Sequence, residues 1–318
     1  MKGHILTLAV FVAFSFGCND GIRRNPIMPS SSFEGSEGNG PTANQADLSM
    51  WSPYIVVHTP GEATMAYQKA IPELMASGAL KGVRISITKG EDKNSVNEWI
   101  ASTNLDILWI LDNYYLFDPN IEQVIDQAVA WYPGIRYLQI GNEITTILPR
   151  PGPQVSVEMY MDILRKIYTY VQIKYPGIIL VTQSTFGSGN HGSLELERMV
   201  ELGLREMSPN RLIVGMNIYS LQTAYNYSHV INRLGLRKDG QSYRIWVTET
   251  GASDPDEHIQ YVQSVYPFLS NVIRAERIYW YCLYCGESGY EAGSGLIKEI
   301  SSPLFWTSPL YDFLARRK

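Results

Sequence analysis

Two glutamates each close an apolar run of the chain. Glu143 ends the run YLQIGNE (137–143), directly after Asn142, and Glu249 ends YRIWVTE (243–249). Hydrolysis of a glycosidic bond needs two carboxylic acids, because one must protonate the leaving oxygen while the other attacks the anomeric carbon or activates water. The sequence therefore suggests glycoside hydrolysis, provided that the fold brings both glutamates to one place.

The dipeptide Asn142-Glu143 alone is a weak signal. The same dipeptide occurs at Asn97-Glu98 inside a stretch of helical period, and carboxylates at strand ends often have no role beyond marking the end. The position after a buried strand and the presence of a second glutamate in the same situation favour a catalytic role, which structural context must support.

Eight short apolar runs are expected to form the strands that position these residues. They lie at 54–58, 82–88, 105–112, 136–142, 178–184, 212–219, 243–249 and 277–284. Most are continuously apolar rather than alternating, which is typical of parallel sheets that are covered on both faces. Segments of helical period separate them, and a last helix is expected at 309–316.

The helices carry recognisable end signals. Asp118-Pro119 is typical of a helix start, and Ser156, Ser193 and Asp254 are candidate N-caps for later helices. The sequence Tyr-Pro-Gly occurs at 132–134 and again at 175–177, each time followed by an isoleucine and a strand. Proline ends a helix and glycine allows the chain to turn back, so both sites predict a change from helix to strand.

Eight strand–helix units within residues 51–318 predict an α/β fold, a (β/α)8 TIM barrel forming a single catalytic domain. A doubly wound sheet would need fewer strands and a phosphate-binding loop after the first one. In a barrel the active site lies at the C-terminal ends of the strands. Glu143 on the fourth strand and Glu249 on the seventh would then face each other across its mouth.

These features resemble a known family. GNE at the end of the fourth strand and TETG at the end of the seventh resemble the clan A, or 4/7, superfamily of retaining glycoside hydrolases, over the whole barrel. The resemblance implies that Glu143 is the acid/base and Glu249 the nucleophile of a double displacement. It also implies a β-linked oligosaccharide or polysaccharide as the substrate, and we expect no cofactor and no metal ion.

The resemblance further implies four substrate-binding or supporting residues on the strands. The asparagine before the acid binds the sugar 2-hydroxyl, an arginine on the second strand and a tyrosine on the sixth support the nucleophile, and a tryptophan on the eighth forms the floor of a sugar subsite. The matching positions in this chain are Asn142, Arg84, Tyr219 and Trp280. The alternative for Arg84 is a salt-bridged barrel residue, and the alternative for the two aromatic residues is packing alone.

One family feature is absent. The histidine usually found near the sixth strand has no counterpart, since the chain has none between His191 and His229. The individual family, and with it the substrate, therefore stays open among glucan, mannan, galactan and xylan. Short connections between strands and helices predict an open groove and cleavage within the polysaccharide chain.

The sequence disfavours several other functions and leaves one of them open. The run 187–192 fits G-x-G-x-x-G, but it follows the fifth strand and lacks an acidic partner after a next strand, which disfavours dinucleotide binding. After the expected signal peptide, the histidines are His58, His191, His229 and His258, and none has metal-ligand spacing, which disfavours a metal-dependent hydrolase. A transglycosylase would use the same two glutamates. A non-catalytic glycan-binding surface lipoprotein would not need a matched acid and nucleophile.

The N-terminus predicts export. Lys2 precedes an apolar run that is too short to span a bilayer, so residues 1–17 are expected to be a signal peptide. Small residues before Cys18 resemble a bacterial lipobox, which predicts lipidation of Cys18. Residues 18–50, rich in Gly, Ser, Pro and Asn, predict a flexible linker. We expect a cell-surface or periplasmic lipoprotein or, without lipidation, a secreted protein.

The composition limits the partners. A net charge of −5 and a pI of about 5.6 disfavour nucleic acid. A membrane is expected to be contacted only through the N-terminal lipid, and we expect a monomer. The remaining cysteines, Cys282 and Cys285, have no second pair with which to form a zinc site, so we expect ordinary buried thiols, although export permits a disulfide.

Overall fold

The computed structural model describes residues 54–57, 64–88, 95–145, 154–185, 189–237, 242–285, 293–301 and 304–316. The expected signal peptide (1–17), the linker (18–50) and Cys18 lie outside the described residues. So do positions 187–188 of the glycine-rich run.

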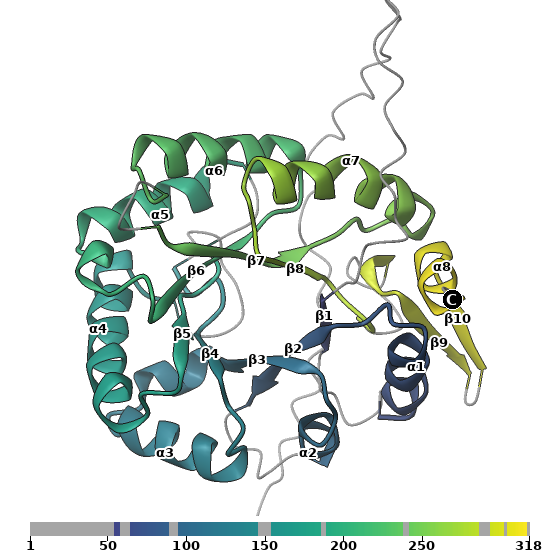
Figure 1. Ribbon diagram of the computed structural model, residues 1–318, viewed down its shortest axis with the longest axis horizontal. Helices are drawn as coiled ribbons and strands as arrows, with labels where there is room; N and C mark the ends of the chain where they lie inside the picture. The colour runs from purple at the N-terminus through teal and green to yellow at the C-terminus, as the bar shows by residue number, and fades with distance from the viewer. Residues whose placement is uncertain are drawn as a thin grey trace, which may run out of the picture. The chain divides into compact units, whose positions relative to one another are not determined.

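Eight parallel strands form a closed barrel in the order of the chain (Figure 1). The strands are β1 (Tyr54–Val57), β2 (Gly82–Ile87), β3 (Asp106–Leu111), β4 (Tyr137–Ile140), β5 (Ile179–Val181), β6 (Leu212–Asn217), β7 (Arg244–Thr250) and β8 (Arg277–Trp280). The barrel closes where β1 pairs with both β2 and β8. The predicted (β/α)8 fold is confirmed, with each strand inside or close to its predicted range.

Helices surround the barrel on its outside (Figure 1). They are α1 (Thr64–Ala76), α2 (Ser95–Ala101), α3 (Ile121–Trp131), α4 (Val157–Lys174), α5 (His191–Glu201), α6 (Leu221–Arg233), α7 (His258–Asn271) and α8 (Pro309–Ala315). In the described part of the chain, no helix combines the length and the apolar character that crossing a membrane requires.

The predicted helix ends are partly correct. The Ser156 hydroxyl accepts a hydrogen bond from the Met159 N–H at 3.2 Å and caps α4, as predicted. Ser193 is not a cap, because α5 already begins at His191. Asp254 caps the short 3-10 helix Pro255–Glu257 that precedes α7. Both Tyr-Pro-Gly sequences follow a helix directly, since Tyr132 and Tyr175 are the C-caps of α3 and α4.

The core has two layers, one inside the barrel and one between strands and helices. The barrel interior contains Val56, Leu108, Tyr137, Val181, Ile213, Trp246, Tyr279 and Cys282. At the N-terminal end of the strands, the Arg277 guanidinium lies 4.0 Å from the ring centre of Trp246 and pairs with Asp106. The outer layer buries the alternate strand residues against the helices. Burial on both faces explains why the strands are continuously apolar.

A two-stranded antiparallel hairpin, β9 (Ile297–Ser301) and β10 (Leu304–Thr307), separates β8 from α8 and was not predicted. The connection between β8 and α8 therefore extends from 281 to 308. The expectation of uniformly short connections is wrong at this strand, although β6 and α6 are separated only by residues 218–220.

Candidate active site

The turn after β4 explains why the strand ends in Gly-Asn-Glu. Gly141 has φ +76°, and a Cβ atom there would lie 2.8 Å from Leu116 Cδ1, so only glycine fits without strain. Glu143 also has a positive φ, +47°, which is uncommon for a residue with a side chain. Asn113 accepts a hydrogen bond from the Asn142 N–H at 2.8 Å and donates to its carbonyl oxygen at 2.9 Å. These contacts hold the unusual backbone that places Glu143.

Glu249, near the end of β7, is a buried carboxylate surrounded by donors. Arg84 Nη1 lies 2.6 Å from Glu249 Oε1 in a buried ion pair. Glu249 Oε2 accepts hydrogen bonds from the Tyr219 hydroxyl at 2.5 Å and from Asn217 Nδ2 at 3.0 Å. A buried carboxylate requires such partners, because removing its charge from water is costly. Glu249 is only 5% exposed, and the cost of burying its charge is offset by the donors of Arg84, Tyr219 and Asn217.

Asn217 connects the two glutamates. Its Nδ2 group donates to Glu143 Oε1 at 2.8 Å and to Glu249 Oε2 at 3.0 Å. Because these two distances add up to 5.8 Å, the two carboxylate oxygens lie no farther apart than 5.8 Å. Carboxyl groups about 5–5.5 Å apart suit double displacement, whereas inversion needs roughly 6.5–9.5 Å to admit a water. The upper limit of 5.8 Å for these two oxygens is closer to the shorter of the two separations.

Arg84 lies on β2 and is held by three acceptors. Besides its ion pair with Glu249, it donates from Nε to Gln139 Oε1 at 2.9 Å and from Nη2 to Asn142 Oδ1 at 2.8 Å. Gln139 is oriented in turn by the Ser184 hydroxyl, which accepts from its Nε2 at 2.8 Å. A guanidinium bound on all sides has one geometry, so the positive charge is fixed beside Glu249.

Tyr219, two residues after the end of β6, is placed as a hydrogen-bond donor. Burial raises the pKa of the Tyr219 phenol well above its ordinary value, and the charges of Glu249 and Glu143 raise it further. The phenol therefore keeps its proton over the working pH range and donates to Glu249.

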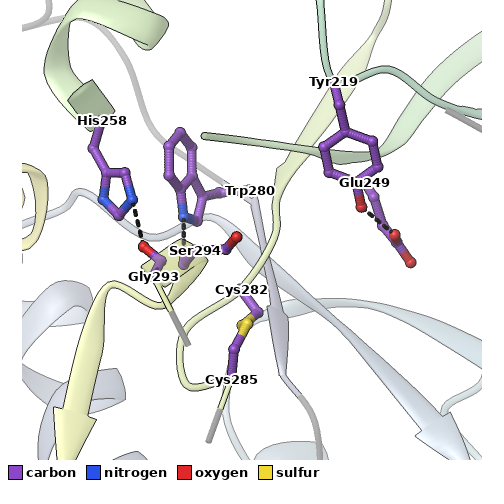
Figure 2. The surroundings of a disulfide bond; sticks show 8 residues. All are labelled: Tyr219, Glu249, His258, Trp280, Cys282, Cys285, Gly293 and Ser294. Carbon is purple, nitrogen blue, oxygen red and sulfur yellow. Dashed lines mark hydrogen bonds between the residues drawn. A yellow bond between two sulfur atoms is a disulfide. The ribbon is translucent and has the colours of Figure 1, made fainter. Parts of the chain in front are cut away.

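Trp280 does not lie at this site. Its side chain is fully buried on the helix side of β8, where the ring packs 4.7 Å from that of His258 and Nε1 donates to the Ser294 carbonyl oxygen. Figure 2 shows this group apart from Tyr219 and Glu249. The prediction that Trp280 forms the floor of a sugar subsite is therefore wrong, because the strand turns this side chain away from the barrel mouth.

The next residue, Tyr281, takes the position on the site side of the chain. Its ring centre lies 6.3 Å from that of Tyr219 at an interplanar angle of 89°, and it is half-buried. Its backbone N–H donates to the Thr250 carbonyl oxygen at 2.8 Å, which anchors it beside the end of β7. Tyr281 is the aromatic residue of this strand that a ligand at the barrel mouth could contact.

The prediction of separate thiols after β8 is also wrong. Cys282 and Cys285 form a disulfide directly after Tyr281 (Figure 2). The Cys282 side chain is fully buried and belongs to the barrel interior. The bridge closes a tight loop from Cys282 to Cys285, which begins directly after Tyr281.

Sequence reasoning assigned no role to Gln139 or Asn217. Gln139 and Asn217 are polar residues without solvent exposure inside apolar strands. Asn217 also stands two residues before Tyr219, and this spacing places Asn217 and Tyr219 on the same face of an extended chain. Either signal could have found them. In the described part of the chain, no cluster of three or more His, Cys, Asp or Glu side chains is placed to hold a metal ion.

No protein-family model matches the chain, and no curated protein matches it. Solved structures are similar to it in fold. Thermotoga maritima Cel5A in complex with a mannotriose substrate has a TM-score of 0.56 at 14% identity, over 84% of this chain and 98% of that chain. The β-mannanase from Thermomonospora fusca has a TM-score of 0.53 at 12% identity, over 84% of this chain and 89% of that chain.

The chain spans less than half of some larger similar structures. A putative β-galactosidase from Bacteroides fragilis has a TM-score of 0.54 at 13% identity, over 83% of this chain but 42% of that chain. For a β-glucuronidase from Bacteroides uniformis, a calcium-binding mutant, the covered share of that chain is 34%. At these identities the similarity establishes the barrel fold.

Proposed function

We propose that the chain is a retaining β-glycosidase in which Glu143 is the general acid/base and Glu249 the nucleophile. The observation that carries this proposal is the pair of buried carboxylates at the C-terminal ends of β4 and β7, whose bridged oxygens lie within 5.8 Å of each other. A pair at this separation supports attack by one carboxylate and proton transfer by the other.

In the first half-reaction, a Glu249 oxygen bonds to the anomeric carbon while the bond from that carbon to the glycosidic oxygen breaks. The leaving oxygen keeps the electron pair and takes the proton of Glu143. Arg84 and Tyr219 hold the Glu249 carboxylate for attack. Asn142 Oδ1 accepts a hydrogen bond from Arg84 Nη2, which leaves the Asn142 Nδ2 group as the donor for the sugar 2-hydroxyl.

In the second half-reaction, water replaces the leaving group. Glu143, now ionised, takes a proton from the water as its oxygen bonds to the anomeric carbon. The bond between that carbon and Glu249 breaks, and its electron pair returns to the carboxylate. Two inversions give net retention, and both glutamates regain their starting protonation states.

The proposed substrate class is supported by the titles of several neighbours in fold. Their titles name a β-mannanase, a mannotriose complex and a xylanase from Talaromyces cellulolyticus. A β-linked polysaccharide, cleaved within the chain, is the substrate that these similarities favour. The partly buried Tyr281 offers an aromatic face of the kind that carbohydrate rings stack on.

A substrate panel tests the proposal. The purified protein is incubated with β-glucan, β-mannan, galactan and xylan, and the products are followed by size over time. The proposal predicts oligosaccharides of intermediate length early in the reaction with one of them. Absence of hydrolysis on this panel and on aryl β-glycosides would contradict the proposed activity, products longer than the substrate would indicate a transglycosylase, and monosaccharides alone would contradict internal cleavage.

A further inference from the structure

We propose that Asn217 is a positioning residue that sets the separation between Glu143 and Glu249 and determines which oxygen of Glu143 carries the catalytic proton. This inference rests on the proposed function. It concerns a residue to which the family resemblance assigned no role, and it follows from one amide group that serves both carboxylates.

The orientation of the Asn217 amide is determined by its partners. The Thr248 hydroxyl lies 3.1 Å from Asn217 Oδ1 and 3.1 Å from the Met216 carbonyl oxygen, and it can donate to either. The carboxylates on the other side of the amide accept hydrogen bonds when they are ionised, so they require a donor. The Nδ2 group must therefore face Glu143 and Glu249. The two hydrogens of the Nδ2 group are both used, one for Glu143 and one for Glu249.

Asn217 closes a ring of hydrogen bonds beneath the site. Gln139 donates to Ser184, Ser184 and Thr248 share a hydrogen bond at 2.5 Å, and Thr248 contacts Asn217. The ring continues through Glu249 and Arg84 back to Gln139. Its members are buried side chains of β2, β4, β6, β7 and the segment after β5. Such a network fixes each member more firmly than a single bond does.

The backbone of β6 is built to deliver this side chain. Met216 pairs with Val247, but Asn217 pairs with Glu249, so the register shifts at this step and Thr248 is passed over. Irregularities of this kind re-aim a side chain and occur next to active sites. The Asn217 N–H donates to the Thr185 carbonyl oxygen at 3.2 Å, which secures the shifted strand end. The shift brings Asn217 level with the nucleophile.

The geometry has two chemical consequences. Glu143 Oε1 is occupied by Asn217 whether the acid is protonated or ionised, because a carbonyl and a carboxylate oxygen both accept. The proton therefore resides on Oε2, from which it passes to the glycosidic oxygen. An amide also keeps the same charge at every working pH, so Asn217 itself adds no titrating group beside the two glutamates.

Two substitutions at this position test the inference. Asn217→Ala removes both hydrogen bonds, and we expect kcat/KM to fall about 10²-fold, as when a fixed donor is lost from an active site. Asn217→Asp keeps the shape but places a third carboxylate beside the pair. Like charges disfavour ionisation, so both limbs of the pH–rate profile should move up by about one pH unit or more.

Asn97→Ala is the matched control. Asn97 is also a buried amide, 2% exposed, and it donates to the Ser86 carbonyl oxygen at 3.0 Å from α2, away from the glutamates. Its loss should lower the melting temperature and leave the pH profile unchanged. Should both Asn217 variants fail to fold, Thr248→Val, which loosens the amide from its other side, should shift the profile in the same direction as Asn217→Asp.

The outcomes separate the inference from the function on which it rests. If the wild type hydrolyses no glycoside, the proposed function fails. If the wild type is active and a folded Asn217→Asp variant keeps the wild-type pH profile and rate, the function stands and the role of Asn217 is refuted. An unchanged profile in Thr248→Val refutes it equally where the Asn217 variants do not fold.

Discussion

Replacing Arg84 with methionine separates a catalytic effect from a structural one. The guanidinium is 1% exposed and pairs with a buried carboxylate, and removing one partner of such a pair costs about 3–5 kcal/mol. Glu249 keeps its hydrogen bonds from Tyr219 and Asn217, so the lower end, about 3 kcal/mol, is expected. At about 2–4 °C per kcal/mol, the melting temperature should fall by roughly 6–12 °C.

The same change should lower kcat because Glu249, the proposed nucleophile, loses its fixed position. A displacement of about 1 Å at a reacting group costs on the order of 10²-fold in rate. Steady-state kinetics on an aryl β-glycoside, measured well below the new melting temperature, report this loss.

Arg277→Met is the matched control for Arg84→Met. Arg277 is also a buried arginine with an acidic partner, but it lies at the opposite end of the strands, stacked on Trp246. Asp106 is 36% exposed and can be hydrated, so a loss of about 1–2 kcal/mol is expected, mainly from the lost cation–π contact. Its kcat should not change. Unchanged turnover in folded Arg84→Met, or an equal loss in Arg277→Met, would refute the reasoning.

Three further predictions concern other parts of the chain. Gly141→Ala should lose about 1–3 kcal/mol of unfolding free energy and most turnover, because φ is +76° and a Cβ would meet Leu116; denaturant titration and kinetics measure both. Burial lowers the pKa of His258 from its ordinary value of 6.5. As the pH falls, His258 is therefore protonated in the unfolded chain before it is protonated in the folded chain. The contribution of neutral His258 to the unfolding free energy should be fully present above about pH 6.5 and should be lost as the pH falls below it. The melting temperature should therefore fall with pH, and it should fall less in His258→Gln. Cys18→Ala should release the protein from detergent-soluble membrane material into the soluble fraction.

Each of these three has a contradicting result. Wild-type turnover in Gly141→Ala would show that the turn tolerates a side chain. An identical pH dependence of melting in wild type and His258→Gln would remove His258 as its source. A wild-type protein found soluble in the periplasm or medium would contradict lipidation of Cys18.

The barrel was predictable because buried parallel strands are continuously apolar and helices end at recognisable sequences. Because the strands are continuously apolar, the sequence does not show which side chains point into the barrel and which point toward the helices. The run Ile278–Cys282 is apolar or aromatic at every position, so no alternation shows that Tyr279 points inward and Trp280 outward. The hairpin β9–β10 was missed because it adds short antiparallel strands within what reads as a loop.

The positions of Glu143 and Glu249 followed from the rule that strand ends meet at one mouth, whereas Arg84, in the middle of β2, was a candidate only through the family resemblance. The role of Asn217 did not, because its contacts depend on a register shift between β6 and β7 that composition does not reveal. The disulfide was missed for a related reason. A C-x-x-C sequence is compatible with thiols, metal or a bridge, and only the loop geometry after β8 decides.

The stereochemistry of azide rescue tests the central claim most directly. In Glu143→Ala, an activated aryl β-glycoside still forms the glycosyl-enzyme, and azide should then attack it without a general base to give the β-glycosyl azide. In Glu249→Ala, azide should occupy the space of the missing carboxylate and give the α-glycosyl azide. Opposite anomers from the two variants are the predicted result. Swapped anomers, or wild-type hydrolysis in either variant, would contradict the assignment of Glu143 as acid/base and Glu249 as nucleophile.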